Sequence, residues 1–243
     1  MISLIVLIGI VLFAGFIRGV SGFGYSLMAT PLMTFIIDAK IVVVMNVMLS
    51  VVGNVLALTQ TRRHIDWKRA IFLALGGIAG VPLGAFLLVK LDQTTIKLII
   101  AVLVIPFSLL LLVGRLHKLN HDTLGCILAG FVGGAVGTTT SFSGPPVVLF
   151  LLNQGLLREQ FVGTIAVFFL VQNMASIAAF SSLKMITPSL LVQVAILVIP
   201  LALGSYLGIK TLPKIKASVF RRIVPIVVSA TALIIIVTIL IKL

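Results

Sequence analysis

Charge of either sign is rare in this sequence, and acidic residues are the scarcest. Of 243 residues only 9% are charged and only five are Asp or Glu, while 60% are hydrophobic. A soluble domain is typically about 25% charged and roughly 45–50% apolar, so this composition excludes one and predicts a chain embedded in a membrane. At about 20 residues per span plus a connection, the length accommodates at most about ten crossings.

Patterns typical of catalysis and metal binding are also missing. The five acidic residues lie at the ends of apolar runs or between them, which argues against a carboxylate proton relay inside the membrane. The three histidines lack zinc-ligand spacing, and the sequence has neither a GxxxxGK[ST] phosphate loop nor a Ser-His-Asp set. The single cysteine, Cys126, is expected to fill space in the core. We therefore expect no enzyme, no metal and no cofactor.

Ten apolar runs account for most of the chain, five in each half. They are apolar all round rather than on one face, which is typical of helices in lipid or in a bundle core. No basic residue precedes the first run, which we therefore expect to be retained rather than cleaved as a signal peptide. The runs cover residues 2–17, 23–37, 40–60, 70–89, 96–113, 123–137, 140–154, 160–180, 188–209 and 223–241. The sequence thus predicts an all-α polytopic membrane protein.

The two halves resemble each other in sequence. AGFIRGVSGFGYSLMATP begins at Ala14 and AGFVGGAVGTTTSFSGPP begins at Ala129, with seven identities over 18 positions at a constant offset of 115. Farther along, Asn54 matches Asn173 at an offset of 119. Internal similarity of this kind predicts two structural repeats, which we place at residues 1–114 and 115–243.

The basic residues predict how the two repeats are oriented. If the 61–69 loop is cytoplasmic and the ten runs alternate across the membrane, 13 of the 18 Lys and Arg residues lie on the cytoplasmic side, as expected for a membrane protein. Each half then holds an odd number of runs, so the repeats have inverted topology, an architecture of secondary transporters. The same distribution assigns most of the net charge of +13 to loops and leaves no face for nucleic acid.

Each half begins with two short runs that glycine and hydroxyl residues interrupt, GVSGFGYS from Gly19 and GTTTSFSGPP from Gly137. Interrupted segments at matching places indicate a transporter binding site, because a helix that starts inside the membrane presents free N–H groups and its positive dipole end to an anion. The alternative is that the glycines let helices pack and the hydroxyls bond to carbonyls of their own helix. The candidate binding residues are Ser21, Gly22, Phe23, Gly24, Tyr25 and Ser26 in the first segment and Gly137, Thr138, Thr139, Thr140, Ser141, Ser143 and Gly144 in the second.

Three more polar residues are candidates for substrate contact. Arg18 adjoins the first segment, where its guanidinium either pairs with an anionic substrate or extends to the membrane interface. Asn54 and Asn173 lie inside the third run of each half, where such amides either join helices or contact substrate; Asn46 and Gln172 lie nearby. Elsewhere, glycines four residues apart predict close helix packing, at Gly15 and Gly19, Gly76, Gly80 and Gly84, Gly130 and Gly134, and Gly204 and Gly208.

The paired glycine-rich segments, each followed by proline, resemble those of the TauE/SafE family of sulfite-exporter-like permeases over nearly the whole chain. The family motifs fall on Gly15, Gly19, Gly22, Gly24 and Pro31, and on Gly130, Gly134, Gly137, Gly144 and Pro146. The resemblance implies a multi-pass protein of the bacterial inner membrane that carries sulfite, sulfonates or related organosulfur anions. Members usually have seven or eight spans, so ten runs fit if each short pair is a broken or re-entrant hairpin.

We therefore expect a secondary transporter that binds a small organosulfur anion between the two glycine-rich segments and works by alternating access. An anion channel and a membrane-embedded scaffold are the alternatives. The expected partners are membrane lipid and the substrate, and a homodimer is left open. In this hypothesis N–H and hydroxyl groups hold the anion while Arg18 attracts it near the cytoplasmic mouth. Loss of one hydroxyl, at Ser21 or Thr139, should then weaken binding roughly tenfold.

Overall fold

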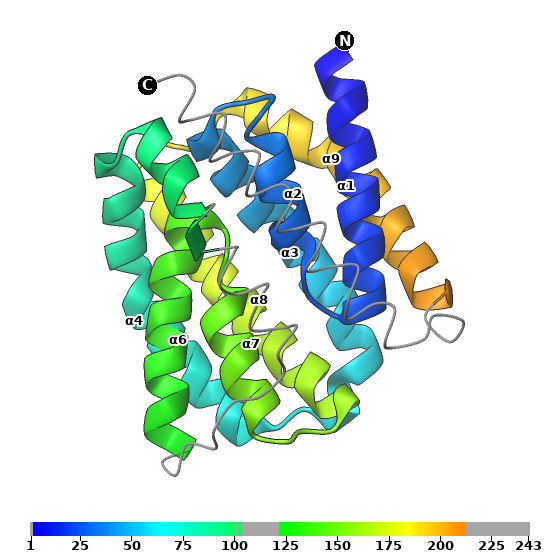
Figure 1. The fold of residues 1–243 in the computed structure, drawn as a ribbon, viewed down its shortest axis with the longest axis vertical. Coiled ribbons are helices and arrows are strands. Elements are labelled where there is room, and N and C mark those ends of the chain that lie inside the picture. Colours follow the sequence, from blue (N-terminus) through cyan, green and yellow to red (C-terminus); the bar gives the residue numbers. More distant parts are fainter. Residues whose placement is uncertain (1, 101, 104–121, 212–243) are drawn as a thin grey trace. The chain divides into compact units, whose positions relative to one another are not determined.

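The computed structural model describes residues 2–100, 102–103 and 122–211, and all regular structure within them is helical (Figure 1). The elements are α1 Ile2–Ser21, α2 Tyr25–Met33, α3 Ala39–Thr61, the short 3-10 helix η1 Arg62–His64, α4 Trp67–Lys90, α6 Asp122–Thr140, α7 Gly144–Asn153, α8 Arg158–Ser182 and α9 Pro188–Thr211. Residues 93–100 are helical as well. The predicted all-α class is confirmed for these residues, whereas the apolar runs 96–113 and 223–241 lie mostly or wholly outside them.

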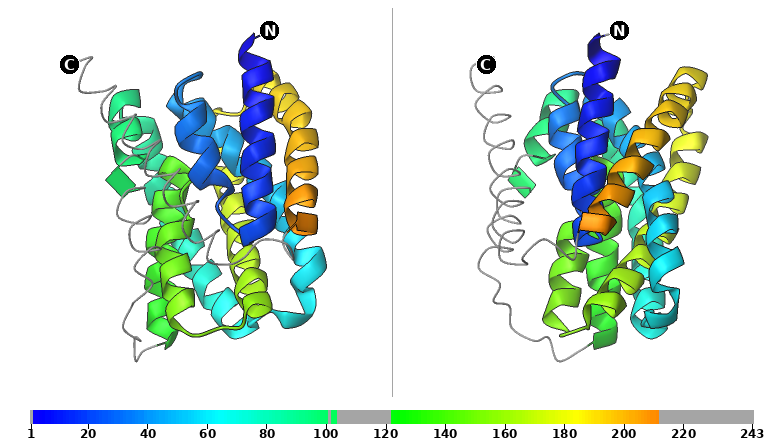
Figure 2. Two further views of the ribbon diagram at one scale, coloured as in Figure 1. Left: turned by 45° about the vertical axis from the view of Figure 1, so that its right-hand side comes forward. Right: turned by 90° about the vertical axis from the view of Figure 1, so that its right-hand side faces the viewer.

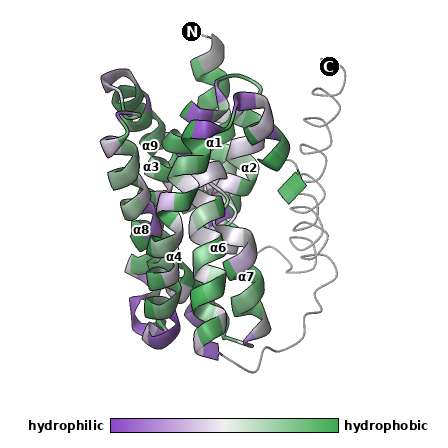
Figure 3. Cartoon of the chain, turned by 90° about the vertical axis from the view of Figure 1, so that its left-hand side faces the viewer, coloured by the Kyte–Doolittle hydropathy of each residue, from purple (hydrophilic) through white to green (hydrophobic). Residues whose placement is uncertain are grey.

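Five helical stretches are long and apolar enough to cross a membrane, namely Ala39–His64, Trp67–Lys90, Asp122–Thr140, Glu159–Ser182 and Pro188–Thr211. A helix of about 20 residues spans about 30 Å, the thickness of the hydrocarbon core. Large apolar side chains are exposed along these helices, and Figure 3 shows hydrophobic colour along α4, α6 and α7 with hydrophilic colour near helix ends. Such a surface fits a polytopic membrane protein, as the composition predicts.

The described residues divide into two compact units that interleave along the chain. The first unit contains residues 2–42, 91–103 without 101, and 195–211, while the second contains residues 43–90 and 122–194. Helices α3 and α9 therefore contribute residues to both units. The two repeats at 1–114 and 115–243 rest on internal sequence similarity and stay a prediction.

Glycine allows close packing of α1 against α9 in the first unit. Gly15 lies against the backbone of Leu201, and a Cβ at Gly19 would collide with the carbonyl oxygen of Ser205. A Cβ at Gly204 would likewise collide with a carbonyl of α1. The contacts advance in the same direction along both helices, so α1 and α9 run parallel. The predicted packing role of these glycines is confirmed.

Glycine also allows close packing of α4 against α6 in the second unit, where the two backbones are in contact over several turns. A Cβ at Gly76 would collide with the carbonyl oxygen of Ile127, one at Gly84 with that of Ala135, and one at Gly134 with that of Gly77. Positions rise together along α4 and α6, so these two helices are also parallel. No side chain larger than hydrogen fits at these glycines, which confirms the sequence prediction.

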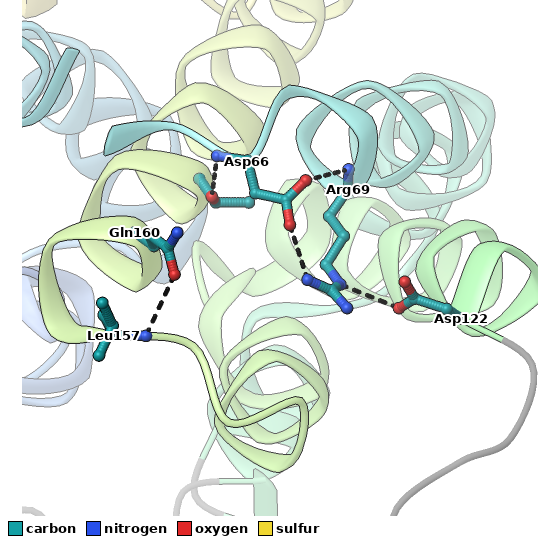
Figure 4. Close-up of polar contacts among 6 residues, drawn as sticks. Asp66, Arg69, Asp122, Leu157 and Gln160 are labelled. Carbon is teal, nitrogen blue, oxygen red and sulfur yellow. Dashed lines mark hydrogen bonds and ion pairs between the residues drawn. The ribbon is translucent and has the colours of Figure 1, made fainter. Parts of the chain in front are cut away.

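Helix α8 runs parallel to α4 and α6, and all three begin at one end of the second unit. The Phe168 ring lies against Gly77 of α4, and the amide of Asp66, just before α4, donates a 3.0 Å bond to Thr164 Oγ1. At this end Arg69 forms two ion pairs, at 2.6 Å to Asp66 and at 3.0 Å to Asp122 (Figure 4). Arg69 thereby ties the start of α4 to the start of α6.

Helices α6 and α7 form an antiparallel hairpin (Figure 2). Gly137, near the end of α6, lies against Ser143 just before α7, whereas Gly125, near the start of α6, lies against the ring of Phe150 in α7. The chain therefore turns back at residues 141–143 and returns along α6. The turn places the second predicted segment at the closed end of the hairpin.

Candidate functional site

Both glycine- and hydroxyl-rich segments contain a three-residue helix break. Helix α1 ends at Ser21 and α2 begins at Tyr25, while α6 ends at Thr140 and α7 begins at Gly144. The amide of Gly22 donates a 2.7 Å bond to the carbonyl four residues earlier, and the amide of Ser141 makes the same bond at the same length. Both residues then adopt positive φ, 81° at Gly22 and 63° at Ser141. The two breaks thus begin with the same backbone turn and diverge by their third residue, where Gly24 has a φ of 92° and Ser143 a φ of −68°.

The backbone correspondence differs from the sequence correspondence by one helical turn. Sequence identities align Gly22 with Gly137 at an offset of 115, whereas the breaks align Gly22 with Ser141, an offset of 119. Four residues make about one turn of α-helix, so the second segment carries an added turn, residues 137–140, before its break. At the helix end Arg18 therefore corresponds to Gly137, and not to Gly133 as the offset of 115 would give.

A buried hydrogen-bonded network occupies the second segment, formed by Thr138, Ser143, Gln172 and Ser176 (the polar network). Ser143 Oγ donates to Gln172 Oε1 at 2.7 Å, and the Gln172 amide donates to Ser176 Oγ at 2.8 Å and to Thr138 Oγ1 at 3.3 Å. Thr138 Oγ1 and Ser176 Oγ lie 2.7 Å apart. All four residues are buried. The network links α6, the break and α8.

The polar network has one more hydrogen to donate than its internal bonds consume. Three hydroxyls and one primary amide supply five hydrogens, and the four bonds use four of them. Whichever of Thr138 and Ser176 accepts in their mutual bond keeps its own hydroxyl hydrogen. The network is uncharged and keeps one donor hydrogen, which suits an acceptor-only ligand such as an oxyanion.

The neighbouring threonines use their hydroxyls differently. Thr139 Oγ1 lies 2.9 Å from the carbonyl oxygen of Ala135 and 3.0 Å from that of Gly84, so its hydrogen serves the contact between α6 and α4. Thr140 Oγ1 donates to the carbonyl of Val136 at 2.7 Å. These two hydroxyls follow the back-bonding alternative considered for the sequence.

The starts of the two short helices also differ in donor groups. Helix α7 begins Gly144, Pro145, Pro146, and proline has no N–H, so its first turn offers few amide hydrogens. Helix α2 begins with Tyr25 and Ser26 after Gly24 in a left-handed conformation, and these residues retain their amides. The sequence hypothesis expected N–H groups at both helix starts to bind the anion. In the second segment the main donors are instead the side-chain hydroxyls and the Gln172 amide.

The first segment contains a buried cation. Arg18 is 6% exposed, and Tyr25, which lies within electrostatic range of its guanidinium, is 1% exposed. Removing a guanidinium from water is costly. The burial of Arg18 therefore favours pairing with an anionic substrate over extension of the side chain to the membrane interface. Phe23 and Ser26 are half-buried, while the side chain of Ser21 lies outside the described set.

Of the predicted site residues, the structure brings Thr138 and Ser143 into one cluster. Asn54 in α3 and Asn173 in α8 are buried but are not members of the polar network. The first segment lies in the first unit and the second segment in the second, so the predicted meeting of the segments stays a prediction. Among the residues described, no group of three or more His, Cys, Asp or Glu is placed to hold a metal.

Sequence reasoning missed Ser176 and named Gln172 only as a polar neighbour of Asn173. The spacing carried a signal, because residues four apart lie on one face of a helix, and Gln172 and Ser176 have that spacing in an apolar run. A lone serine in a membrane helix usually bonds to its own backbone, and this made Ser176 inconspicuous.

Comparisons with known proteins agree with the architecture. The family model described as sulfite exporter TauE/SafE matches residues 7–235. Two proteins named "Probable membrane transporter protein", from Xylella fastidiosa strains 9a5c and Temecula1 / ATCC 700964, are 29% and 26% identical over 170 residues. Each match covers 61% of this chain and 63% of the relative, and no solved structure matches. Since the family model spans nearly the whole sequence, the chain belongs to the sulfite exporter TauE/SafE family.

Proposed function

We propose that the protein is a secondary membrane transporter of small organosulfur anions, such as sulfite or sulfonates. The family's description and the names of the relatives support transport and an oxidised sulfur substrate. The observation that carries the proposal is the buried polar network beside the break between α6 and α7. A buried uncharged cluster with a spare donor hydrogen matches an anion that must be both bound and released.

In the proposed mechanism the two breaks form one site, and the halves of the chain rock around it in alternating access. The first segment supplies the Arg18 charge and the N–H groups at the start of α2. The second segment supplies Thr138, Ser143, Gln172 and Ser176 side chains. A helix start is equivalent to about +0.5 charge, so with Arg18 the site would balance an anion of charge −1 to −2.

We further propose that the two halves are inverted repeats and that α6 and α7 form a re-entrant hairpin. The similar breaks, each with a long helix before and a short helix after, support the repeats, and the return of α7 along α6 supports the hairpin. Cysteines introduced at positions 64 and 93 test the parity, because the first is expected to label from the cytoplasm and the second from outside. Labelling of both from one side would contradict the inverted arrangement. Native Cys126 is buried and gives little background.

Uptake into proteoliposomes tests the transported class. Sulfite, thiosulfate, sulfoacetate, sulfate and a carboxylate are compared with and without a pH gradient, and saturation and counterflow separate a carrier from a channel. Gln172→Leu removes the centre of the polar network and should lower the apparent affinity by tenfold or more, since three hydrogen bonds lose a partner. Gln193→Leu, on α9 and bonded only weakly to Ser189 at 3.5 Å, is the matched control.

Two outcomes would contradict the proposal. One is the absence of saturable uptake for every sulfur anion in the panel. The other is saturable uptake that Gln172→Leu leaves at the level of Gln193→Leu, which would keep transport but move the site away from the polar network.

A further inference from the structure

Four exposed residues lie between the end of α3 and the first turn of α4. Arg62 and Arg63 lie on η1, and Trp67 and Lys68 open α4; all four are exposed. Trp67 is 58% exposed. We call Arg62, Arg63, Trp67 and Lys68 the basic patch.

Two acidic residues near the basic patch are already engaged. Asp66 and Asp122 both pair with Arg69, which is only 22% exposed at its side chain. Within the described ranges both ion pairs at this end are formed by Arg69. The charges of Arg62, Arg63 and Lys68 are therefore not neutralised by an ion pair and can attract an external anion. The ion pairs also hold the starts of α4 and α6 in place beneath the patch.

An apolar stripe leads away from the basic patch along α4. Ile71, Leu75 and Ile78 follow Trp67 at spacings of four, four and three residues, and each is at least 45% exposed. These spacings put them on one helix face, which in a membrane-spanning helix faces lipid. A tryptophan between basic residues and an apolar stripe is typical of the membrane interface.

We infer that the basic patch binds the headgroup of an anionic phospholipid whose acyl chains lie along the Trp67–Ile78 stripe. The headgroup phosphate meets three cations, the indole ring lies at the level of the headgroup, and the acyl chains meet exposed apolar side chains. A soluble phosphate would use the cations but gain nothing from the stripe. The partner is therefore a lipid rather than a free anion, and this inference does not depend on what the protein transports.

Trp67 reports on this site directly, because it is the single tryptophan of the chain. The protein is reconstituted in phosphatidylcholine vesicles that contain a fixed fraction of one brominated lipid. That lipid is either phosphatidylglycerol or phosphatidylcholine, each with bromine in its acyl chains. Bromine quenches a tryptophan that it contacts, so the difference between the two lipids measures enrichment beside Trp67. We expect stronger quenching by brominated phosphatidylglycerol, and we expect the difference to shrink as salt rises.

Charge removal separates a specific site from general attraction. Each Lys or Arg near an anionic surface contributes about fivefold in affinity, so Arg62→Gln, Arg63→Gln and Lys68→Gln together should remove the preference, a loss of up to about a hundredfold. The control carries Lys90→Gln, Lys184→Gln and Lys210→Gln, which together remove the same charge at exposed positions elsewhere. This control variant should keep the preference for phosphatidylglycerol. Lys68→Gln alone, expected to cost about fivefold, serves if the triple variant folds poorly.

Three results would overturn the inference. The first is equal quenching of the wild-type protein by the two brominated lipids, and the second is an equal loss of preference in the patch and control variants. The third is removal of the preference by inorganic phosphate when sodium chloride of equal ionic strength leaves it, which would indicate a site for a small soluble anion.

Discussion

The break between α1 and α2 and the break between α6 and α7 begin with the same backbone turn and carry different chemistry. Gly22 and Gly24 both have positive φ in the first break, whereas Ser141 alone has positive φ in the second. The first carries the buried cation Arg18, while the second carries uncharged hydroxyls and the Gln172 amide. The comparison teaches that the turn that opens each break is compatible with different donors, so the two segments can divide the tasks of charge balance and hydrogen bonding.

The largest expected effect is the loss of the charge from the first segment. Arg18→Gln should lower substrate affinity about a hundredfold or more, because charge-assisted hydrogen bonds contribute about 1.5–3 kcal/mol each and a guanidinium makes two with an oxyanion. A buried pair is poorly screened, so calorimetry should give a similar loss at low and high salt. Arg18→Lys is the control that keeps the charge and loses the two-pronged geometry.

The salt dependence distinguishes the two roles considered for Arg18. The sequence hypothesis placed it at the cytoplasmic mouth, where its effect would shrink at high salt, and its 6% exposure favours direct contact instead. A loss confined to low salt would restore the role at the mouth and would remove the charge from the site.

The second expected effect separates two adjacent threonines of the added turn. Thr138→Val removes a hydroxyl of the polar network and should weaken binding roughly tenfold, as expected for a donor to a charged ligand. Thr139→Val makes the same chemical change, but its hydroxyl serves backbone carbonyls, so affinity should change by less than about twofold. This revises the tenfold loss first expected for Thr139. Equal losses in the two variants, measured by calorimetry, would refute the division of tasks along the turn.

The smallest expected effect concerns the backbone of the breaks. Gly22→Ser puts in the first break the residue type found in the second, and at a φ of 81° an L-residue costs about 1–2 kcal/mol. The thermal midpoint in detergent should therefore fall. Gly9→Ser is the matched control, because Gly9 lies in the preceding helix α1 with nothing near its would-be Cβ and serine is a better helix former than glycine. An equal fall in both variants would show that strain at the break is not the cause.

The sequence predicted the features that depend on pattern and missed those that depend on local register. Apolar runs predicted the helices, and glycine spacing predicted the close approach at Gly76, Gly84 and Gly134, because only glycine lets backbones meet. Identities gave the offset of 115 but not the added turn, since four residues complete about one turn and leave the helix face nearly unchanged. The partner of a buried hydroxyl, as at Ser176, depends on helices far apart in sequence and leaves no local pattern.

The glycine contacts of α4 and α6 have a consequence for biogenesis. The two helices are parallel neighbours, yet residues 91–121 separate them in the chain, so α4 enters the bilayer before its partner is synthesised. Until α6 arrives, the glycine face of α4 lacks its matching helix, and lipid chains fill a backbone groove less well than such a helix does. A nascent chain that ends before Asp122 should therefore be more accessible to membrane proteases than one that extends past Thr140, and the pairing of Arg69 with Asp122 would mark the point at which assembly of the second unit begins.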